Sequence, residues 1–266
     1  RERTAMPRAL LERLPNLRLV TITGTEHRTL DRAAARERGV VVCHSAPRAG
    51  SGQGQGTPEL TIALMLALAR KIAFEDTRMR AGHWQSTTGT TLWGKTLGVI
   101  GLGRVGRRVA ELGRAFGMTV LAWSPNMTAA AAAAAGALLV TKDELFAASD
   151  YVSLHVVLGE RSRGIVGAGE LAAMKPTAYL INTSRGPLVD EDALLSALRE
   201  HRIGGAALDV FWSEPLAGDH PIRSLPNVVL TPHLGYAVEE SFRAFYEDTV
   251  ENIEAWLDGK PIRVLP

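Results

Sequence analysis

The feature that most constrains the fold is an alternation of short apolar, β-branched segments with amphipathic segments of helical periodicity. Residues 97–100 form the clearest apolar segment, and the later segments expected to be strands are 120–123, 138–140, 151–157, 178–181, 206–210 and 228–230. Helical patterns fill most of the gaps, at 105–116, 127–136, 142–148 and 190–201. Such an alternation favours parallel pairing, because a parallel connection needs a long crossover. The pattern therefore predicts an α/β fold with parallel sheets covered by helices.

The segments before residue 97 continue the same alternation. The elements expected there are a strand (17–22), a helix (30–38), a strand (40–42) and a surface loop rich in Gly, Ser and Gln (46–56). Residues 60–80 predict one long helix, and its middle is apolar on nearly all sides, so it needs cover on more than one face. Residues 238–257 predict a final helix that stops before a Gly-Lys-Pro sequence.

A glycine-rich turn follows the apolar strand at 97–100 and opens the helix after it. Its sequence is G-x-G-x-x-G, in which Gly101 permits a tight turn, Gly103 lets the backbone approach a ligand, and Gly106 lets the helix pack close to the strand. Free N–H groups and the helix dipole favour an anion at such a helix start. Between a strand and a helix, this motif predicts that the turn binds the pyrophosphate of a dinucleotide.

The end of the next expected strand bears on the choice between NAD and NADP. Dinucleotide folds place an acidic residue there to bind the ribose 2′-hydroxyl, but this chain has Trp123, Ser124, Pro125 and Asn126. Without a carboxylate, nothing repels a 2′-phosphate, and Ser124 and Asn126 are able to bond a hydroxyl or a phosphate. The sequence therefore allows either cofactor, with a lean toward NADP. An alternative is that Asn126 only caps the following helix.

Three polar segments each follow an expected strand, at the edge where α/β sheets bind ligands. The first carries Arg185, whose guanidinium is able to grip a carboxylate with two hydrogen bonds. The second carries Glu214. The third carries His233 between Pro232 and Gly235, and an imidazole beside a carboxylate is suited to proton transfer near neutral pH. Together the three side chains predict a site that binds an acid and moves a proton.

These motifs, in this order, resemble the D-isomer-specific 2-hydroxyacid dehydrogenase family. The matching residues are 96–106, 182–186, 208–211 with 214–215, and 231–233. The resemblance implies two Rossmann-like domains with the active site in the cleft between them. It places residues 1–66 and 238–266 in a substrate domain that lacks its N-terminal part, and residues 67–237 in a dinucleotide-binding domain.

The resemblance also implies roles for individual residues. Arg185 would bind the substrate carboxylate, His233 would act as the acid and base, and Glu214 would pair with His233. Asp209 would face the nicotinamide end of the cofactor. The remaining expected contacts are Arg104 and Val105 with the pyrophosphate, His155, Thr183 and Gly235 along the cofactor groove, and Thr23, Gly24 and Thr25 in the substrate loop. The implied reaction is hydride transfer between NAD or NADP and a small D-2-hydroxy or 2-keto acid, such as glyoxylate or hydroxypyruvate.

Composition excludes few alternatives. The 30 basic and 28 acidic residues leave a net charge of +2, which is weak support for a nucleic-acid partner. Cys43 is the single cysteine, no His, Cys, Asp and Glu cluster has metal-ligand spacing, and no apolar stretch is long enough for a membrane span. We therefore expect a cytoplasmic enzyme without metal, and by analogy a homodimer formed through the helix at 60–80. The alternatives are a corepressor-type protein that senses NAD(H) and a phosphite-type dehydrogenase on the same scaffold.

Overall fold

The computed structural model describes residues 4–27, 29–46, 52 and 54–266. The chain divides into two compact units, one made of Arg1–Gly54 and Ala237–Pro266, the other of Gln55–Tyr236. We call them unit 1 and unit 2. The first division falls at residues 54 and 55, whereas the sequence placed it between 66 and 67. Most of the expected surface loop at 46–56 lies outside the described residues.

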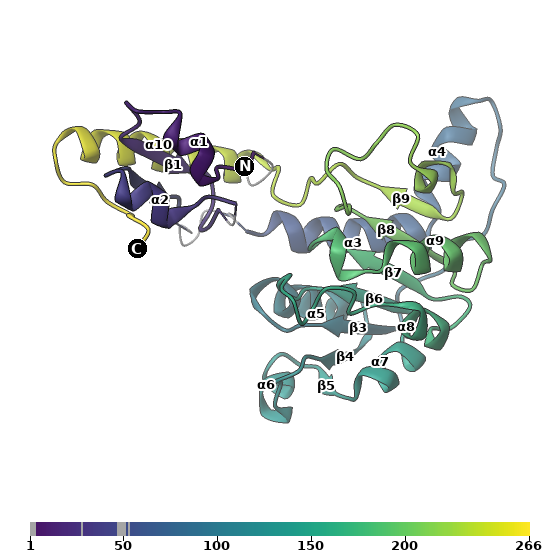
Figure 1. The fold of residues 1–266 in the computed structure, drawn as a ribbon. Coiled ribbons are helices and arrows are strands. Elements are labelled where there is room, and N and C mark those ends of the chain that lie inside the picture. Colours follow the sequence, from purple (N-terminus) through teal and green to yellow (C-terminus); the bar gives the residue numbers. More distant parts are fainter. Residues whose placement is uncertain (1–3, 28, 47–51, 53) are drawn as a thin grey trace. The chain divides into compact units, whose positions relative to one another are not determined.

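Unit 2 is built on a seven-stranded parallel sheet with the order β5-β4-β3-β6-β7-β8-β9 (Figure 1). Its strands are β3 (Thr96–Ile100), β4 (Thr119–Trp123), β5 (Leu138–Leu139), β6 (Tyr151–Leu154), β7 (Tyr179–Asn182), β8 (Gly205–Leu208) and β9 (Val228–Leu230). The strand order reverses direction between β3 and β6, and such a switch point is where doubly wound sheets bind their ligands. The expected α/β fold with a parallel sheet is confirmed.

Helices cover both faces of this sheet. The helices of unit 2 are α3 (Gly56–Ala69), α4 (Ile72–Arg80), α5 (Arg104–Ala115), α6 (Ala129–Ala134), α7 (Lys142–Ala148), α8 (Ala168–Ala173) and α9 (Glu191–Arg199). One core joins α3, α5 and α6 to the sheet through residues such as Met65, Val109 and Ala132. The other core joins α7, α8 and α9 through Phe146 and Leu194, among others. Burial on both faces explains why the strands are almost continuously apolar.

The prediction of one long helix at 60–80 is wrong. The chain turns at Lys71, whose positive φ of 52° breaks the helix into α3 and α4. The carbonyl of Ala69 at the end of α3 accepts a hydrogen bond from the backbone N–H of Thr90 at 2.8 Å. A helix end is stable where its last carbonyls find partners. Here the partner, Thr90, lies far along the chain from Ala69, so no local sequence pattern indicates it. The apolar middle of the segment is buried on several sides of α3, as expected.

Several smaller boundaries also differ from the sequence prediction. The helix expected at 127–136 is shortened to α6, because the Thr128 hydroxyl caps it by accepting from Ala131 N at 3.2 Å. Gly136 follows it with a positive φ of 67°. Because Thr128 is the N-cap, Asn126 does not cap this helix, and the alternative role expected for Asn126 is wrong. The strand expected at 151–157 ends at Leu154.

Unit 1 is a small α/β unit in which β1 (Leu19–Ile22) pairs in parallel with β2 (Val41–His44). Its helices are α1 (Arg8–Glu12), α2 (Arg32–Glu37) and α10 (Glu239–Leu257), and α10 packs on both strands. The core is formed by Leu11, Leu30, Ala34, Ala35, Val40 and Val42. The C-terminal segment returns to the edge of β2, where Cys43 bridges to Val264 in antiparallel fashion. Chain segments far apart in the sequence therefore build one layer of strands under α10.

Candidate active site

The three polar segments follow β7, β8 and β9, which are neighbours in the sheet. The strands are parallel, so their carboxyl ends lie at one edge, and Arg185, Glu214 and His233 all come from loops that leave this edge. The site is therefore assembled from segments that are separate in the sequence. Arg185 and Glu214 are both partly buried in their loops.

His233 and Glu214 form the central pair of the site. The imidazole Nδ1 lies 2.6 Å from Oε2 of Glu214, and the two side chains are 22% and 17% exposed. The other oxygen, Oε1, accepts from the backbone N–H of Phe211 at 3.1 Å, which fixes the carboxylate. With Nδ1 held as the donor to Glu214, Nε2 is the nitrogen left for proton exchange with another group. The pair thus has the geometry of an oriented acid and base.

Asp209 holds the turn that carries His233. Its carboxylate is fully buried and accepts from Thr231 Oγ1 at 2.6 Å, from Leu234 N at 2.7 Å and from Gly235 N at 2.9 Å. His233 lies inside this turn with a positive φ of 60°, a conformation that is costly for a residue other than glycine and needs support from its surroundings. Asp209 therefore supports the conformation of His233, and its expected contact with the nicotinamide end remains a prediction.

Arg185 lies in a loop that is held by hydrogen bonds on one side and by a close backbone contact on the other. Asn182 donates from Nδ2 to the Arg185 carbonyl at 2.9 Å and accepts from Ser184 N at 3.0 Å. The next residue, Gly186, touches the backbone after β8 so closely that a Cβ there would lie 2.1 Å from the Phe211 carbonyl carbon. Only glycine allows this approach, so Gly186 lets the Arg185 loop pack against the loop that carries Glu214.

The G-x-G-x-x-G turn has the geometry of a phosphate cradle. A Cβ on Gly106 would lie 1.9 Å from the Gly101 carbonyl oxygen, so only glycine lets α5 start this close to β3. Gly101 has a positive φ of 94°, and a Cβ on Gly103 would meet nothing within 4 Å. No side chain caps α5 at Gly103, so the N–H groups of its first turn, from Arg104 and Val105 onward, are open to an anion. These residues fit a dinucleotide pyrophosphate.

His155 lies directly beside this cradle. Its Cβ would be 3.2 Å from a Cβ on Gly106, and its Nε2 lies 2.8 Å from Ser153 Oγ. Burial of the ring lowers the pKa of His155 to about 3, and its buried Nδ1 has no partner among the described residues. His155 is therefore neutral at physiological pH and adds no charge to the phosphate turn. Ser124 is partly buried and Asn126 exposed beyond the end of β4, the neighbour of β3.

The expected substrate loop, Thr23 to Thr25, lies in unit 1 directly after β1. Ser45 ties it to the end of β2, because Ser45 N donates to the Gly24 carbonyl at 3.1 Å and Ser45 Oγ donates to the Ile22 carbonyl at 3.3 Å. Thr23 and Thr25 are exposed. The loop is thus anchored at its backbone while both of its threonines are exposed.

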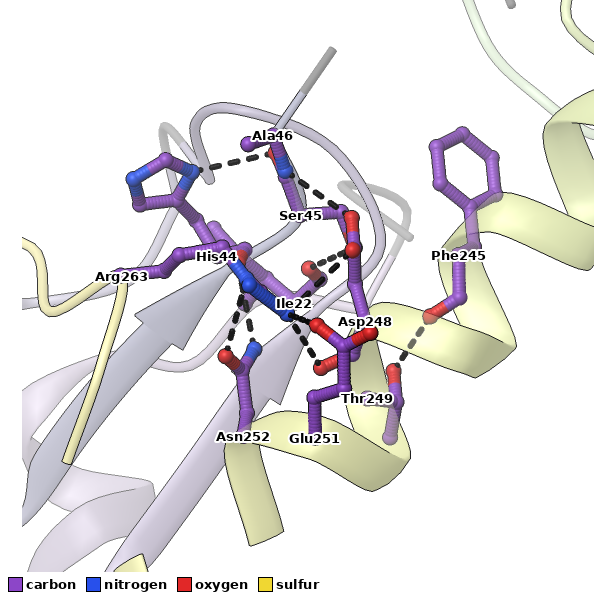
Figure 2. Close-up of polar contacts among 10 residues, drawn as sticks. All are labelled: Ile22, His44, Ser45, Ala46, Phe245, Asp248, Thr249, Glu251, Asn252 and Arg263. Carbon is purple, nitrogen blue, oxygen red and sulfur yellow. Dashed lines mark hydrogen bonds and ion pairs between the residues drawn. The ribbon is translucent and has the colours of Figure 1, made fainter. Parts of the chain in front are cut away.

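The end of β2 is fixed in turn by a buried polar network on α10 (Figure 2). Asp248 accepts from Ala46 N at 3.0 Å, and Asn252 donates from Nδ2 to the His44 carbonyl at 3.1 Å. Arg263 contacts both side chains: its Nη2 lies 3.3 Å from Asp248 Oδ1, and its Nε donates to Asn252 Oδ1 at 3.1 Å. Arg263 also forms an ion pair with Glu251. Burial of Asp248 is therefore balanced by a cation and a backbone donor.

Sequence reasoning missed two threonines on α3. Thr57 Oγ1 donates to the Gly235 carbonyl at 2.9 Å, and Thr61 Oγ1 lies 2.9 Å from Thr183 Oγ1. Both side chains face the strand-end loops, and their spacing of four residues on one face of a helix is the only signal in the sequence. Gly186 was missed as well, although a glycine beside a charged residue in a strand-end loop is a reason to look for a close backbone approach.

Comparison with known proteins identifies the family. Residues 62–235 match the family model of the NAD binding domain of D-isomer specific 2-hydroxyacid dehydrogenases. The chain belongs to this family. The resemblance drawn from the motifs is confirmed, and the matched region contains the phosphate turn, Arg185, Glu214 and His233.

Three curated members of this dehydrogenase family illustrate its range of activities. The chain is 37% identical over 265 residues to D-3-phosphoglycerate dehydrogenase of Synechocystis, covering 99% of this chain and 47% of the relative. It is 38% identical to glyoxylate reductase of Aeropyrum pernix, covering 94% and 76%. It is 32% identical to hydroxypyruvate reductase of Blautia hydrogenotrophica, covering 99% and 83%. The chain thus spans about half the length of the phosphoglycerate enzyme and most of the two reductases.

Solved structures of the dehydrogenase family share the fold of this chain. Phosphoglycerate oxidoreductase from Vibrio cholerae O395 matches with a TM-score of 0.90 and 36% identity, covering 97% of this chain and 82% of that one. D-lactate dehydrogenase from Aquifex aeolicus, complexed with NAD and lactic acid, matches with 0.78 and 30%, covering 96% and 80%. An acyclic imino acid reductase in complex with NADPH and D-Arg matches with 0.78 and 32%, covering 99% and 83%. The fold and a nicotinamide cofactor of either type are therefore supported.

The described residues contain no group of three or more His, Cys, Asp or Glu side chains arranged to hold a metal ion. None of the helices they form combines the length and the apolar composition that a membrane crossing requires.

Proposed function

We propose that this protein transfers a hydride between NAD(P)(H) and the C2 carbon of a small D-2-hydroxy or 2-keto acid, such as glyoxylate or hydroxypyruvate. The observation that carries the proposal is the His233 and Glu214 pair, with Nδ1 and Oε2 2.6 Å apart, on strand-end loops that adjoin the loop of Arg185. The names of the glyoxylate and hydroxypyruvate reductase relatives support the substrate class.

The proposed roles follow from charge. Arg185 binds the substrate carboxylate and so orients the C2 carbonyl. When bound, the nicotinamide cofactor supplies or accepts the hydride at C2. In the reductive direction negative charge grows on the carbonyl oxygen, and His233 donates a proton from Nε2 to it. Glu214 stabilises the imidazolium before that transfer, and in the oxidative direction His233 takes the proton back.

The proposed cofactor contacts extend along the carboxyl edge of the sheet. The pyrophosphate would be held by the backbone of Gly101, Gly103, Arg104, Val105 and Gly106. His155, Thr183, Asp209 and Gly235 would line the groove, and Ser124 and Asn126 would contact the ribose. Since no carboxylate stands at Ser124, we propose that NADP(H) is accepted at least as well as NAD(H). On the substrate side, Thr23, Gly24 and Thr25 would contact the acid.

We also propose a homodimer formed through α4. The apolar middle of α3 is already covered by unit 2, so it no longer calls for a partner. No residue of α4 is buried, and its Ile72, Phe74 and Met79 are 53%, 44% and 56% exposed. Apolar side chains gathered on one exposed helix favour contact with a second copy. Phe74→Glu should shift the protein from dimer to monomer in sedimentation velocity. A wild-type protein that sediments as a monomer would refute the proposed dimer.

The test of the proposed activity follows the absorbance of the nicotinamide cofactor. The protein would be mixed with NADH or NADPH and with glyoxylate, hydroxypyruvate, pyruvate and bulkier 2-keto acids in turn. Turnover of any of these acids supports the dehydrogenase function, and the ratio of kcat/KM for the two cofactors decides the cofactor preference. Cofactor binding without turnover of any 2-keto acid would refute the proposed dehydrogenase function.

A further inference from the structure

A chain of three threonine hydroxyls connects two of the strand-end loops through α3. Thr57 Oγ1 donates to the Gly235 carbonyl at 2.9 Å, and Thr61 Oγ1 donates to the Thr57 carbonyl at 2.8 Å. Thr61 Oγ1 also lies 2.9 Å from Thr183 Oγ1. Thr183 stands two positions before Arg185, and Gly235 two positions after His233. The first two turns of α3 therefore contact the loops of both residues.

The direction of these hydrogen bonds is determined by the number of protons. A hydroxyl has one proton to donate and two lone pairs that accept. Thr61 uses its proton toward the Thr57 carbonyl, so at the contact with Thr183 it accepts, and Thr183 donates. The hydroxyl proton of Thr183 is thereby turned toward α3. Toward any bound group, Thr183 presents only lone pairs.

Two of the three threonines are also shielded from water. Thr61 is completely buried, and Thr183 is 7% exposed. A buried hydrogen bond to a single partner is costly to lose, because the group left behind is desolvated and unpaired. Gly235 is doubly held, since its N–H donates to Asp209 and its carbonyl accepts from Thr57. The loop after β9 is thus fixed from β8 on one side and from α3 on the other.

We propose that Thr57 and Thr61 are positioning residues that keep the loops of Arg185 and His233 in mutual register. The proposal rests on the function proposed above, in which Arg185 holds the substrate carboxylate and His233 exchanges the proton. The guanidinium and the imidazole must contact the carboxylate and the C2 oxygen of the same substrate, so the distance between them has to fit the size of the acid. A displacement of ~1 Å in such an arrangement lowers the rate roughly a hundredfold. The same chain makes Thr183 a pure acceptor, which suits an N–H donor such as the carboxamide of a nicotinamide cofactor.

The test compares valine and serine variants. Thr57→Val and Thr61→Val keep the β-branched shape and remove the hydroxyl, and Thr57→Ser keeps the hydroxyl. Thr77→Val is the matched control, because Thr77 on α4 makes the same bond to the carbonyl four residues earlier, to Ala73 at 2.9 Å, on an exposed surface. We expect kcat to fall about 10- to 100-fold in the two valine variants with the dissociation constant for the pyrophosphate-bearing cofactor changed less than threefold, on the order that misalignment produces. Thr57→Ser should recover most of the loss, and Thr77→Val should show none.

A second measurement keeps the two proposals distinguishable. Hydrogen exchange monitored by mass spectrometry reports on the amides of residues 183–186 and 231–236 without any turnover. If the wild type turns over no 2-keto acid, the proposed function fails, and faster exchange in both segments of the valine variants but not of Thr77→Val still supports the positioning role. A kcat within twofold of the wild type in folded Thr57→Val and Thr61→Val overturns it, as does unchanged exchange in an inactive protein.

Discussion

A single methyl group on Gly103 is expected to weaken cofactor binding while leaving the fold intact. Gly103 has φ of −71° and ψ of −165°, which any residue adopts, and a Cβ there would meet nothing within 4 Å. Gly103→Ala should therefore unfold at the same temperature as the wild type. In the proposed complex this Cβ stands where the pyrophosphate approaches the backbone. The loss of one hydrogen bond to a charged group costs about 1.5–3 kcal/mol, which corresponds to a dissociation constant roughly 10- to 150-fold higher.

Gly106→Ala provides the contrast. Its Cβ would lie 1.9 Å from the Gly101 carbonyl oxygen, so α5 or the turn must move. Overpacking of this kind costs about 1–3 kcal/mol, and for a chain of this size each kcal/mol lowers Tm by about 2–4 °C. Gly106→Ala should therefore lose both stability and cofactor affinity. Gly169→Ala, in the exposed part of α8 where a Cβ meets nothing, is the control for a harmless methyl group.

The assay is a titration of each variant with NADH and NADPH, followed by tryptophan fluorescence or calorimetry, beside a thermal melt. We expect Gly103→Ala to lower the cofactor affinity without lowering Tm, and Gly106→Ala to lower both. If Gly103→Ala binds both cofactors as tightly as the wild type, the turn after β3 does not hold the pyrophosphate and the cofactor assignment fails.

Three further predictions concern His233, Asp248 and His155. His233→Ala should lower kcat by about 10²- to 10⁴-fold while the cofactor dissociation constant stays within threefold, and unchanged turnover would remove its acid and base role. Asp248→Ala should lower the free energy of unfolding by about 1–3 kcal/mol in urea titrations, because Ala46 N loses its acceptor and the partly buried Arg263 loses one of its two carboxylate partners, whereas exposed Glu254→Gln should not. Since burial holds the pKa of His155 at about 3 while the unfolded chain takes up the proton near 6.5, stability should fall by about 1.4 kcal/mol per pH unit as the pH drops from about 6.5 toward 3. His155→Gln should flatten that decline, and an equal slope in both proteins would contradict the assignment.

The sheet and the location of the site were predictable because both follow from chain order. Strands separated by helices pair in parallel, so segments after successive strands meet at one edge, and Arg185, Glu214 and His233 do follow three adjacent strands. The phosphate turn was also predictable from the spacing of its glycines, because each of the three positions has a separate steric reason to be glycine.

What the sequence does not contain is the partner of each polar group. Nothing around Asp209 in the sequence indicates its partners, yet it is buried because Thr231, Leu234 and Gly235, more than twenty residues later, supply its donors. The break between α3 and α4 likewise depends on Thr90, which returns to Ala69. Hydroxyls such as Thr61 satisfy themselves on their own helix in any context, so nothing local distinguishes one that also reaches Thr183.

These contacts divide the proposed function between two sets of residues. In unit 2, both carboxylates near His233 are bonded within the protein: Glu214 contacts Phe211 N and the imidazole, and Asp209 accepts from three donors of one turn. Each of their oxygens already contacts a group of the protein, so under the proposed function these side chains serve proton transfer and the geometry of His233. In unit 1, the Thr23 and Thr25 hydroxyls are exposed on a loop whose backbone is anchored by Ser45 and, behind it, by Asp248 and Arg263. Under the proposed function, proton transfer therefore depends on groups that the protein holds in place around His233, and the choice of acid depends on the exposed hydroxyls of Thr23 and Thr25.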